Sequence, residues 1–211
     1  MTTPRAPKRA RVTYRRATEA DLDVLTDHRH RMWTSIGHRT EAEISEHDPR
    51  NRRWMRPRFR SGELTGVLAL APDGTPAGSG LVWFRPDQPR PQISLLRVPY
   101  ILSMYTRPEW RGRGIASQIV RRLVADCRAK GYPSVVLHAS EQGRSVYRRL
   151  GFERTWEMRY WVDPGMRRRR ARWAAAARRK GRKGWTGRVT RTRSRPPLPR
   201  ARRSGPGRSA A

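Results

Sequence analysis

The stretch "RPEWRGRGIASQIVRRL", residues 107–123, decides the fold of this chain. Two glycines, Gly112 and Gly114, stand among arginines, and an amphipathic segment follows them at once. A glycine lets the backbone approach a ligand closely because no Cβ intervenes. The first N–H groups of a helix lack internal partners and carry partial positive charge from the helix dipole. The stretch therefore predicts a helix start that binds a phosphorylated ligand, unless the glycines only shape a tight turn.

The segment after the glycines has helical periodicity. Its apolar residues recur every four positions and form one stripe, at Ile115/Ala116, Ile119/Val120, Leu123/Val124 and Cys127. Charged residues such as Arg121 and Asp126 lie off that stripe, and Gly131 marks the expected end of the helix. We therefore expect a helix that buries one face.

The rest of the foldable region alternates between strand and helix signals. A capping box at Thr18–Asp21 opens a helix, and Asp73–Gly74 is a turn signal between two strands. The expected strands are 12–17, 63–70, 77–84, 99–106, 133–139 and a closing strand at 153–162, and the expected helices carry Leu22 to Trp33, span 41–59, begin at Ile115 and span 141–150. This order predicts one mixed-sheet α/β domain over residues 11–163, with helices packed on the sheet.

Charge is spread unevenly along the chain. The formal net charge is +31, and residues 165–211 hold 18 of the 48 basic residues and no acidic residue. Residues 164–211 are rich in Arg, Ala, Gly and Pro, so we expect them to be disordered, as we do the basic arm 1–10. The helix formers of Met166–Lys180 are the exception and can fold on a partner.

Other features bound the compartment and class. The single cysteine, Cys127, excludes an internal disulfide. No run approaches the roughly 18 apolar residues of a membrane span, and the charged N-terminus lacks the apolar segment of a secretory signal. We expect a cytoplasmic protein without membrane contact, a monomer or homodimer, and we identify no set of metal ligands.

Three phosphate-binding motifs compete for the glycine stretch. A dinucleotide fingerprint requires a third glycine where Ser117 stands, and an acid about 20 residues on, where the chain reads Leu137-His138-Ala139. A nucleoside-triphosphate loop requires Gly-Lys-Ser/Thr, which is absent. The segment "MYTRPEWRGRGIA", residues 104–116, instead resembles the acetyl-coenzyme-A motif Q/R-x-x-G-x-G/A of the GCN5-related N-acetyltransferases, as Arg111-x-x-Gly114-x-Ala116.

A second segment supports the same resemblance. "VYRRLGFE", residues 146–153, is similar to that family's second signature, in which a tyrosine stands three residues before Leu-Gly-Phe. One helix and one strand separate the two motifs, as in the family, and the expected element order agrees with its fold. The resemblance covers roughly residues 12–162. It implies an acetyl-CoA-dependent N-acetyltransferase that transfers the acetyl group directly to a primary amine of a small molecule or protein.

The resemblance also implies roles for individual residues. The strand end would lend backbone groups to the pantetheine arm, and the loop would hold the pyrophosphate. The implied cofactor-binding residues are Met104, Tyr105 and Thr106 on the strand and Arg111, Gly112, Arg113, Gly114, Ile115, Ala116 and Ser117 in the loop and helix start. Ser140 stands where many members have an asparagine that contacts the cofactor. Tyr147 matches the usual general acid, and a phenol with a pKa near 10 is protonated at neutral pH.

The sequence leaves the general base and the acceptor open. The strand segment "YILSM", residues 100–104, has no Glu or Asp, so the base is His138, Glu141 or water. The acceptor pocket is expected from the 30–60 helices and the 85–98 loop. Arg52, Arg53 and Arg56 there either favour an acidic acceptor or form a solvated helical face.

The basic tail supports an alternative function. Residues 165–211 can bind nucleic-acid phosphates without sequence preference, hold an acidic partner, or serve no function. Tryptophans at 173 and 185 favour nucleic acid, because aromatic rings stack on bases. The alternative is therefore a nucleic-acid-binding protein with an accessory or inactive acetyltransferase-like domain.

Overall fold

The computed structural model describes residues 11–37, 39–89 and 95–158 and, beyond these, residues 160, 162, 163, 165, 166, 168, 169, 171, 172 and 175. The chain divides into one unit of residues Met1–Glu157 and a second of Met158–Ala211. The predicted basic arm, part of the 85–98 loop and most of the tail lie outside the described residues. Within the described part of the chain, no helix is both long and apolar enough to cross a membrane.

The first unit is built on a five-stranded sheet in the order β1-β2-β3-β4-β5. The strands are β1 Thr13–Arg16, β2 Leu64–Leu70, β3 Pro76–Pro86, β4 Arg97–Thr106 and β5 Val136–Leu137. β1 to β4 pair antiparallel, and β4 pairs parallel with β5. The predicted hairpin is confirmed: Thr75 donates its N–H to Asp73 Oδ1 at 2.9 Å, in the turn between β2 and β3.

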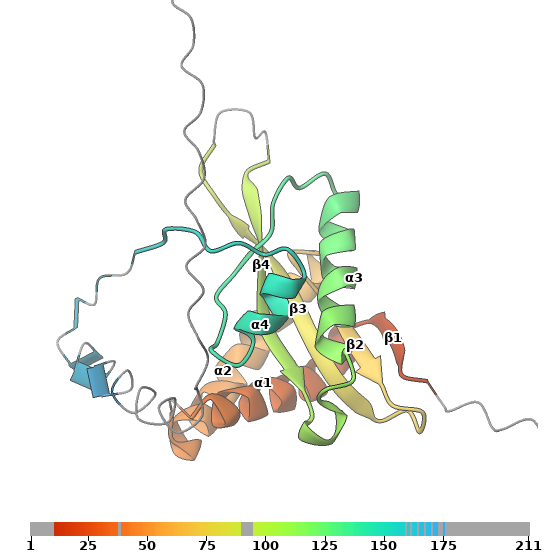
Figure 1. Cartoon of the computed structure of the whole chain (residues 1–211), viewed down its shortest axis with the longest axis horizontal. Helices are drawn as coiled ribbons and strands as arrows, with labels where there is room; N and C mark the ends of the chain where they lie inside the picture. Colours follow the sequence, from red (N-terminus) through yellow and green to blue (C-terminus); the bar gives the residue numbers. More distant parts are fainter. Residues whose placement is uncertain are drawn as a thin grey trace, which may run out of the picture. The chain divides into compact units, whose positions relative to one another are not determined.

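Helices cover both faces of the sheet (Figure 1). α1 (Leu22–Ile36) and α2 (Glu41–Arg60) lie on one face, α3 (Ile115–Ala129) lies on the other, and α4 (Arg144–Arg149) follows β5. The predicted stripe of α3 is confirmed, because Ile115, Ile119, Val120, Leu123 and Cys127 are buried against β3 and β4. Leu22, Leu25 and Met55 form the core on the opposite face. Adjacent strand residues divide between the two cores, as the pleat requires.

The entry to α1 follows the predicted capping box. Thr18 donates its backbone N–H to Asp21 Oδ2 at 2.8 Å, and a short 3₁₀ turn, Glu19–Asp21, leads into the helix. The guanidinium of Arg15 on β1 donates two hydrogen bonds to the same carboxylate, of 2.7 and 2.6 Å. This pair lowers the pKa of Asp21, because a guanidinium hydrogen bond favours the ionised carboxyl. The ion pair therefore fixes α1 to the edge of the sheet.

The predicted closing strand at 153–162 is wrong for the residues that the structure describes. These residues are not in a strand, and β5 is shorter than predicted. The side chains of Trp156, Met158, Tyr160 and Val162 are 80–93% exposed. Their alternation is typical of a strand, but a strand needs a neighbouring ladder, and β5 offers only two residues. Beyond this segment, the described residues between 165 and 175 are helical.

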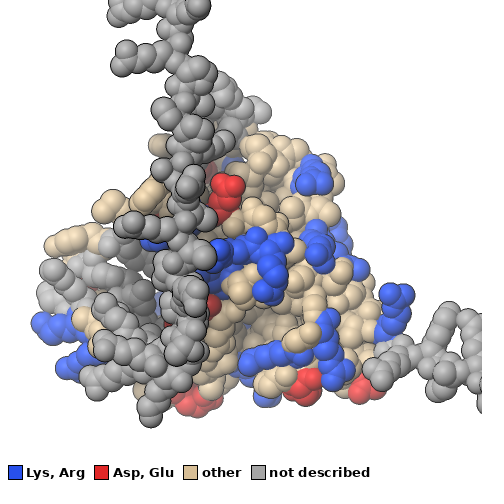
Figure 2. All heavy atoms as spheres, viewed as in Figure 1, with Lys and Arg blue, Asp and Glu red and all other residues tan. Residues whose placement is uncertain are grey.

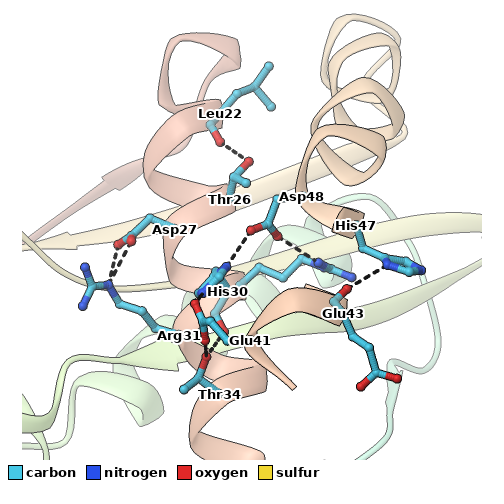
Figure 3. Close-up of polar contacts among 11 residues, drawn as sticks. Leu22, Thr26, Asp27, His30, Arg31, Thr34, Glu41, Glu43, His47 and Asp48 are labelled. Carbon is cyan, nitrogen blue, oxygen red and sulfur yellow. Dashed lines mark hydrogen bonds and ion pairs between the residues drawn. The ribbon is translucent and has the colours of Figure 1, made fainter. Parts of the chain in front are cut away.

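A polar network joins α1 to α2 (Figure 3). His30 on α1 lies between two carboxylates of α2, with Nδ1 at 2.6 Å from Asp48 Oδ2 and Nε2 at 2.5 Å from Glu41 Oε1. Carboxylates only accept hydrogen bonds, so two carboxylate partners require a proton on each ring nitrogen of His30. The hydrogen bond with Asp48, and to a smaller extent that with Glu41, therefore raises the pKa of His30. The charged ring thus bridges the two helices.

The bridge makes stability depend on pH. Because folding raises the pKa of His30, its contribution is complete below the unfolded value, about 6.5, and is lost as pH rises through the folded value. We expect His30→Gln to reduce the free energy of unfolding by about 1 kcal/mol more at pH ~6 than at pH ~9. Urea unfolding at both pH values measures this, with His47→Gln on α2, an exposed histidine, as the control. An equal loss at both pH values would contradict the charged bridge.

Candidate active site

A gap opens between β4 and β5. The two strands pair only at Tyr100–Val136 and Ile101–Leu137. β5 ends there, while β4 continues to Thr106. No other described strand pairs with this edge of β4 beyond Ile101, so its backbone N–H and C=O groups face the gap. An unpaired strand edge of this kind can bind an extended ligand through main-chain hydrogen bonds.

A bulge in β4 coincides with the gap. The register with β3 shifts between Ser79 and Leu81, and Ser103 has a φ of 50°, which is unusual for a residue other than glycine. The bulge changes the alternation of side chains: Leu102 packs in the α1–α2 core, whereas Met104 packs in the α3 core. β4 is therefore turned locally at the point where it parts from β5.

The glycine loop lies at the end of this strand. After a short turn at Pro108–Trp110, Gly112 and Gly114 adopt φ values of 74° and 77°, in the left-handed region that favours glycine. Gly114 is the N-cap of α3, and no side chain caps the helix. The N–H groups of Ile115, Ala116 and Ser117 thus stand at an open helix N-terminus.

Side chains join the loop to β4. Arg111 donates from Nε to the carbonyl of Thr106 at 3.1 Å, and the guanidinium of Arg113 lies 4.7 Å from the ring of Trp110. The hydroxyl oxygen of Thr106 is buried and has no hydrogen-bond partner. The structure therefore brings the predicted residues 104–106 and 111–117 together, and it leaves one buried polar atom among them unsatisfied.

Tyr147 lies on α4, the helix that follows β5. Its ring contacts Phe152 with centroids 5.8 Å apart and packs against the α3 core. Burial and, to a smaller extent, neighbouring Tyr100 together raise the pKa of Tyr147 to about 12. The hydroxyl is therefore protonated at neutral pH and able to donate a proton.

Ser140 caps the turn into α4. Its Oγ accepts a hydrogen bond from the N–H of Gly143 at 3.1 Å. This contact leaves the hydroxyl proton of Ser140 available to another group. Glu141 is exposed in the same turn.

Two residues near the gap were missed by the sequence analysis. Tyr100 is hydrogen-bonded to Nδ1 of His138, and Nε2 of His138 lies 2.7 Å from Glu157 Oε1. His138 was considered there as a base, but Tyr100 and Glu157 were not. They are 38 and 19 residues away from it in the sequence, so no local spacing could have identified them.

The charges on the two faces differ. Arg52 and Arg56 were considered from the sequence as residues that favour an acidic acceptor. In the structure Arg52 pairs with Asp23 at 2.7 Å, and Arg56 pairs with Glu19 at 3.4 Å. The cavity between α1 and α2, of about 540 Å³, is lined by Asp23, Asp27, His30, Asp48 and Arg52 among others. On the other face, exposed arginines lie on α3 and α4 (Figure 2). Arg111 and Arg113 are exposed in the glycine loop at the end of β4, and their positive charge favours an anionic ligand there.

The comparisons with known proteins agree with this geometry. The Acetyltransferase (GNAT) family matches residues 14–152. A glucosamine 6-phosphate N-acetyltransferase from Trypanosoma brucei brucei is 31% identical over 118 residues, which are 56% of this chain and 77% of that protein. A GCN5-related N-acetyltransferase from Ralstonia eutropha JMP134 has a TM-score of 0.67 and 27% identity, and the match covers 72% of this chain and 99% of that one.

A further solved structure contains the acetyl donor. It is a predicted acetyltransferase with acetyl-CoA from Clostridium acetobutylicum, with a TM-score of 0.66, 27% identity and coverage of 72% of this chain and 96% of that one. The fold and the site thus define an acyl-CoA-dependent transferase. The chain belongs to the GNAT family of acetyltransferases and uses acetyl-CoA as the donor.

The residues present fit acetyl-CoA. The free edge of β4 can pair with the amide groups of a pantetheine arm, and the unsatisfied hydroxyl of Thr106 is a further polar partner at its end. The open start of α3 offers N–H groups to a pyrophosphate. Backbone and dipole, rather than particular side chains, supply most of this complementarity.

The start of α3 can be tested with two isosteric substitutions. Gly114→Asn and Gly114→Asp both place a residue that tolerates positive φ better than most, and they differ by one negative charge. We expect the aspartate variant to bind acetyl-CoA at least about tenfold more weakly than the asparagine variant, or about 1.4 kcal/mol. The same charge should favour the helix itself by a few tenths of a kcal/mol.

Calorimetry of acetyl-CoA binding and thermal unfolding without ligand measure the two effects. If Gly114→Asp is slightly more stable than Gly114→Asn but binds acetyl-CoA more weakly, the ligand places an anion at the start of α3. Equal affinities of the two folded variants would contradict it.

Proposed function

We propose that this acetyltransferase transfers the acetyl group to a primary amine and that the acceptor is a small molecule or an exposed amine of a protein. The observation that carries the proposal is the gap between β4 and β5, where the edge of β4 continues without a described partner strand to Thr106 and the glycine loop. A thioester held there is accessible to an amine from the α1–α2 side.

The residues have distinct tasks in this proposal. The backbone of residues 104–106 binds the pantetheine arm, and that of residues 112–117 binds the pyrophosphate, with Arg111 and Arg113 adding positive charge. Acetyl-CoA supplies an activated thioester, in which the C–S bond breaks as the C–N bond forms. Tyr147 donates a proton to the departing sulfur, and its raised pKa, about 12, keeps that proton available at neutral pH.

The relatives suggest where to begin with the acceptor. The relative from Trypanosoma brucei brucei is named for glucosamine 6-phosphate, so this amino sugar phosphate is the first acceptor to test, with lysine peptides and simple amines beside it. Release of the free thiol from acetyl-CoA reports turnover for each acceptor. Turnover of no amine, by a protein that binds acetyl-CoA, would contradict the proposal.

The nucleic-acid alternative gains no support from the described residues. It depends on residues 165–211, of which the structure describes only a few between 165 and 175. We therefore propose no nucleic-acid function.

The role of Tyr147 gives a direct prediction. Tyr147→Phe keeps the packed ring and removes only the hydroxyl, so the fold and acetyl-CoA affinity should change little. Turnover should fall by about 10²- to 10⁴-fold, the usual effect of removing a positioned acid. Steady-state kinetics and calorimetry measure the two quantities, and Tyr132→Phe, a partly buried ring stacked on Phe84 5.1 Å away, is the matched control. Near-normal turnover of the Tyr147 variant would show that the acid lies elsewhere.

A further inference from the structure

The bulge in β4 separates a short end of the strand from the rest. Beyond the register shift between Ser79 and Leu81, two register pairs join β4 to β3, Gly78 with Thr106 and Ser79 with Tyr105. On its other edge, this end of β4 pairs with no described strand. It therefore has a strand partner on one side only, although it carries two of the residues that the proposed function places along the pantetheine arm.

One side chain contacts both members of a register pair in this strand end. His28 on α1 is 1% exposed, and its Nδ1 lies 2.9 Å from Ser79 Oγ. The centroid of its ring lies 5.1 Å from that of Tyr105, with the two rings tilted by 50°. Ser79 and Tyr105 lie opposite each other on β3 and β4. His28 therefore links the two strands, by a hydrogen bond to one and by ring packing against the other.

The other face of the same strand end is closely packed. A Cβ on Gly78 would lie 2.8 Å from the carbonyl oxygen of Tyr105 and 3.3 Å from Cγ2 of Ile115, the first residue of α3. The backbone of β3 thus fits tightly against both β4 and the start of α3. Since α1 and α3 cover opposite faces of the sheet (Figure 1), the two helices contact this end of the strands from both sides.

Backbone contacts join the strand end to the glycine loop. Arg107 donates its N–H to the carbonyl of Ala77 at 3.0 Å, and Arg111 donates from Nε to the carbonyl of Thr106 at 3.1 Å. The loop is thus attached to the residues that directly follow Tyr105. Because closely packed interiors transmit small displacements, a shift of Tyr105 would move both the free edge of β4 and the loop.

A neutral imidazole suits this position. The hydroxyl of Ser79 is buried and requires a hydrogen-bond partner inside the protein, which an aliphatic side chain at position 28 could not supply. Burial lowers the pKa of His28 to about 4, so the ring is neutral at physiological pH. The charged groups that act on the ring are Asp27, Arg107 and Arg31, and Asp27 pairs with Arg31 at 2.8 Å. The ring therefore provides a polar contact in the core without a charge.

We propose that His28 is a positioning residue for acetyl-CoA, which holds Ser79 and Tyr105 together and thereby keeps the free edge of β4 in the arrangement that the donor requires. The inference rests on the proposed placement of the pantetheine arm along residues 104–106. His28 acts through β4, because its ring is buried on the α1 side while the groups assigned to the donor are backbone atoms. If the edge is in place in only a fraction of the molecules, the apparent Kd rises by the inverse of that fraction.

Two substitutions remove the hydrogen bond from either side. His28→Phe keeps an aromatic ring beside Tyr105 but removes the ring nitrogens, and Ser79→Ala removes the hydroxyl with little loss of volume. We expect each variant to raise the Kd for acetyl-CoA by about three- to tenfold, the range that loss of one hydrogen bond permits. Because both variants lose the same contact, the double variant should bind little more weakly than either single variant. Calorimetry on the full chain measures these constants.

Steady-state kinetics distinguish positioning from a role in the chemical step. The KM for acetyl-CoA should rise in His28→Phe and in Ser79→Ala, whereas kcat at saturating acetyl-CoA should stay near the wild-type value. This split is expected because the substitutions weaken binding that the ground state and the transition state share. His28→Asn, whose amide can replace Nδ1 as a partner of Ser79, should recover part of the affinity that His28→Phe loses.

A core substitution on the same helix is the control for a general loss of stability. Leu25 lies one turn before His28 and packs in the α1–α2 core. Leu25→Val should lower the thermal stability without changing the Kd for acetyl-CoA. Amide hydrogen exchange adds a measurement without ligand: the N–H of Arg107 should exchange faster in His28→Phe and Ser79→Ala, relative to the amides of the β2–β3 ladder, and at an unchanged relative rate in Leu25→Val.

The outcomes separate the positioning role from its alternatives. Wild-type affinity for acetyl-CoA in folded His28→Phe and Ser79→Ala would overturn the proposal, and Ser79→Ala alone decides if His28→Phe does not fold. An equal loss of affinity in Leu25→Val would show that stability alone is responsible, which also overturns it. If the expected losses occur but the protein acetylates no amine, the proposed function fails and the positioning role stands.

Discussion

The pairing of β4 with β5 ends after two residues, and the whole site depends on that ending. A continuous parallel ladder would satisfy the backbone groups of Leu102 to Thr106 and leave no edge for a ligand. The bulge at Ser103 turns β4, and the chain after Leu137 leaves the sheet for the turn that Ser140 caps. Both departures occur at the same level of the sheet. The gap is thus a local defect in the sheet, kept in place by the helices on each side.

One of these supports lies directly behind the free edge of β4. His28 on α1 is almost fully buried, and its Nδ1 forms a hydrogen bond of 2.9 Å with Ser79 Oγ. The centroid of its ring lies 5.1 Å from that of Tyr105. Burial lowers its pKa to about 4, so the ring is neutral at physiological pH. A neutral, packed ring holds α1 against β3 and β4 where β4 has lost its other neighbour.

The distribution of charge follows the same division. On the α1–α2 side, carboxylates pair with arginines, as in the pairs of Arg52 with Asp23 and of Arg60 with Glu19 at 2.7 Å each. Exposed pairs of this kind contribute little stability, but they remove free positive charge from that face. Arginines on α3 and α4 remain exposed, and so do Arg111 and Arg113 of the glycine loop. Free positive charge is thereby more abundant on the face that carries α3 and on the glycine loop, where it favours an anionic donor.

The sequence by itself determined the elements whose signals are local. The stripe of α3, the turn at Asp73–Gly74, the capping box at Thr18 and the left-handed glycines of the loop each depend on neighbours within a few residues, so the residue types were sufficient. The two family motifs added the class of enzyme, because their order along the chain matches the order of elements in the fold.

Only the tertiary structure decided where β5 ends and which side chains meet across the sheet. The alternating residues 153–162 have the pattern of a strand, but pattern does not reveal whether a neighbouring ladder exists, and β5 offers only two residues. Tyr100, His138 and Glu157 come from a strand, a strand end and a segment after α4. Their contact depends on the pairing of β4 with β5 and on the path of the chain beyond α4. Such contacts arise from packing between distant segments, which no spacing within the sequence encodes.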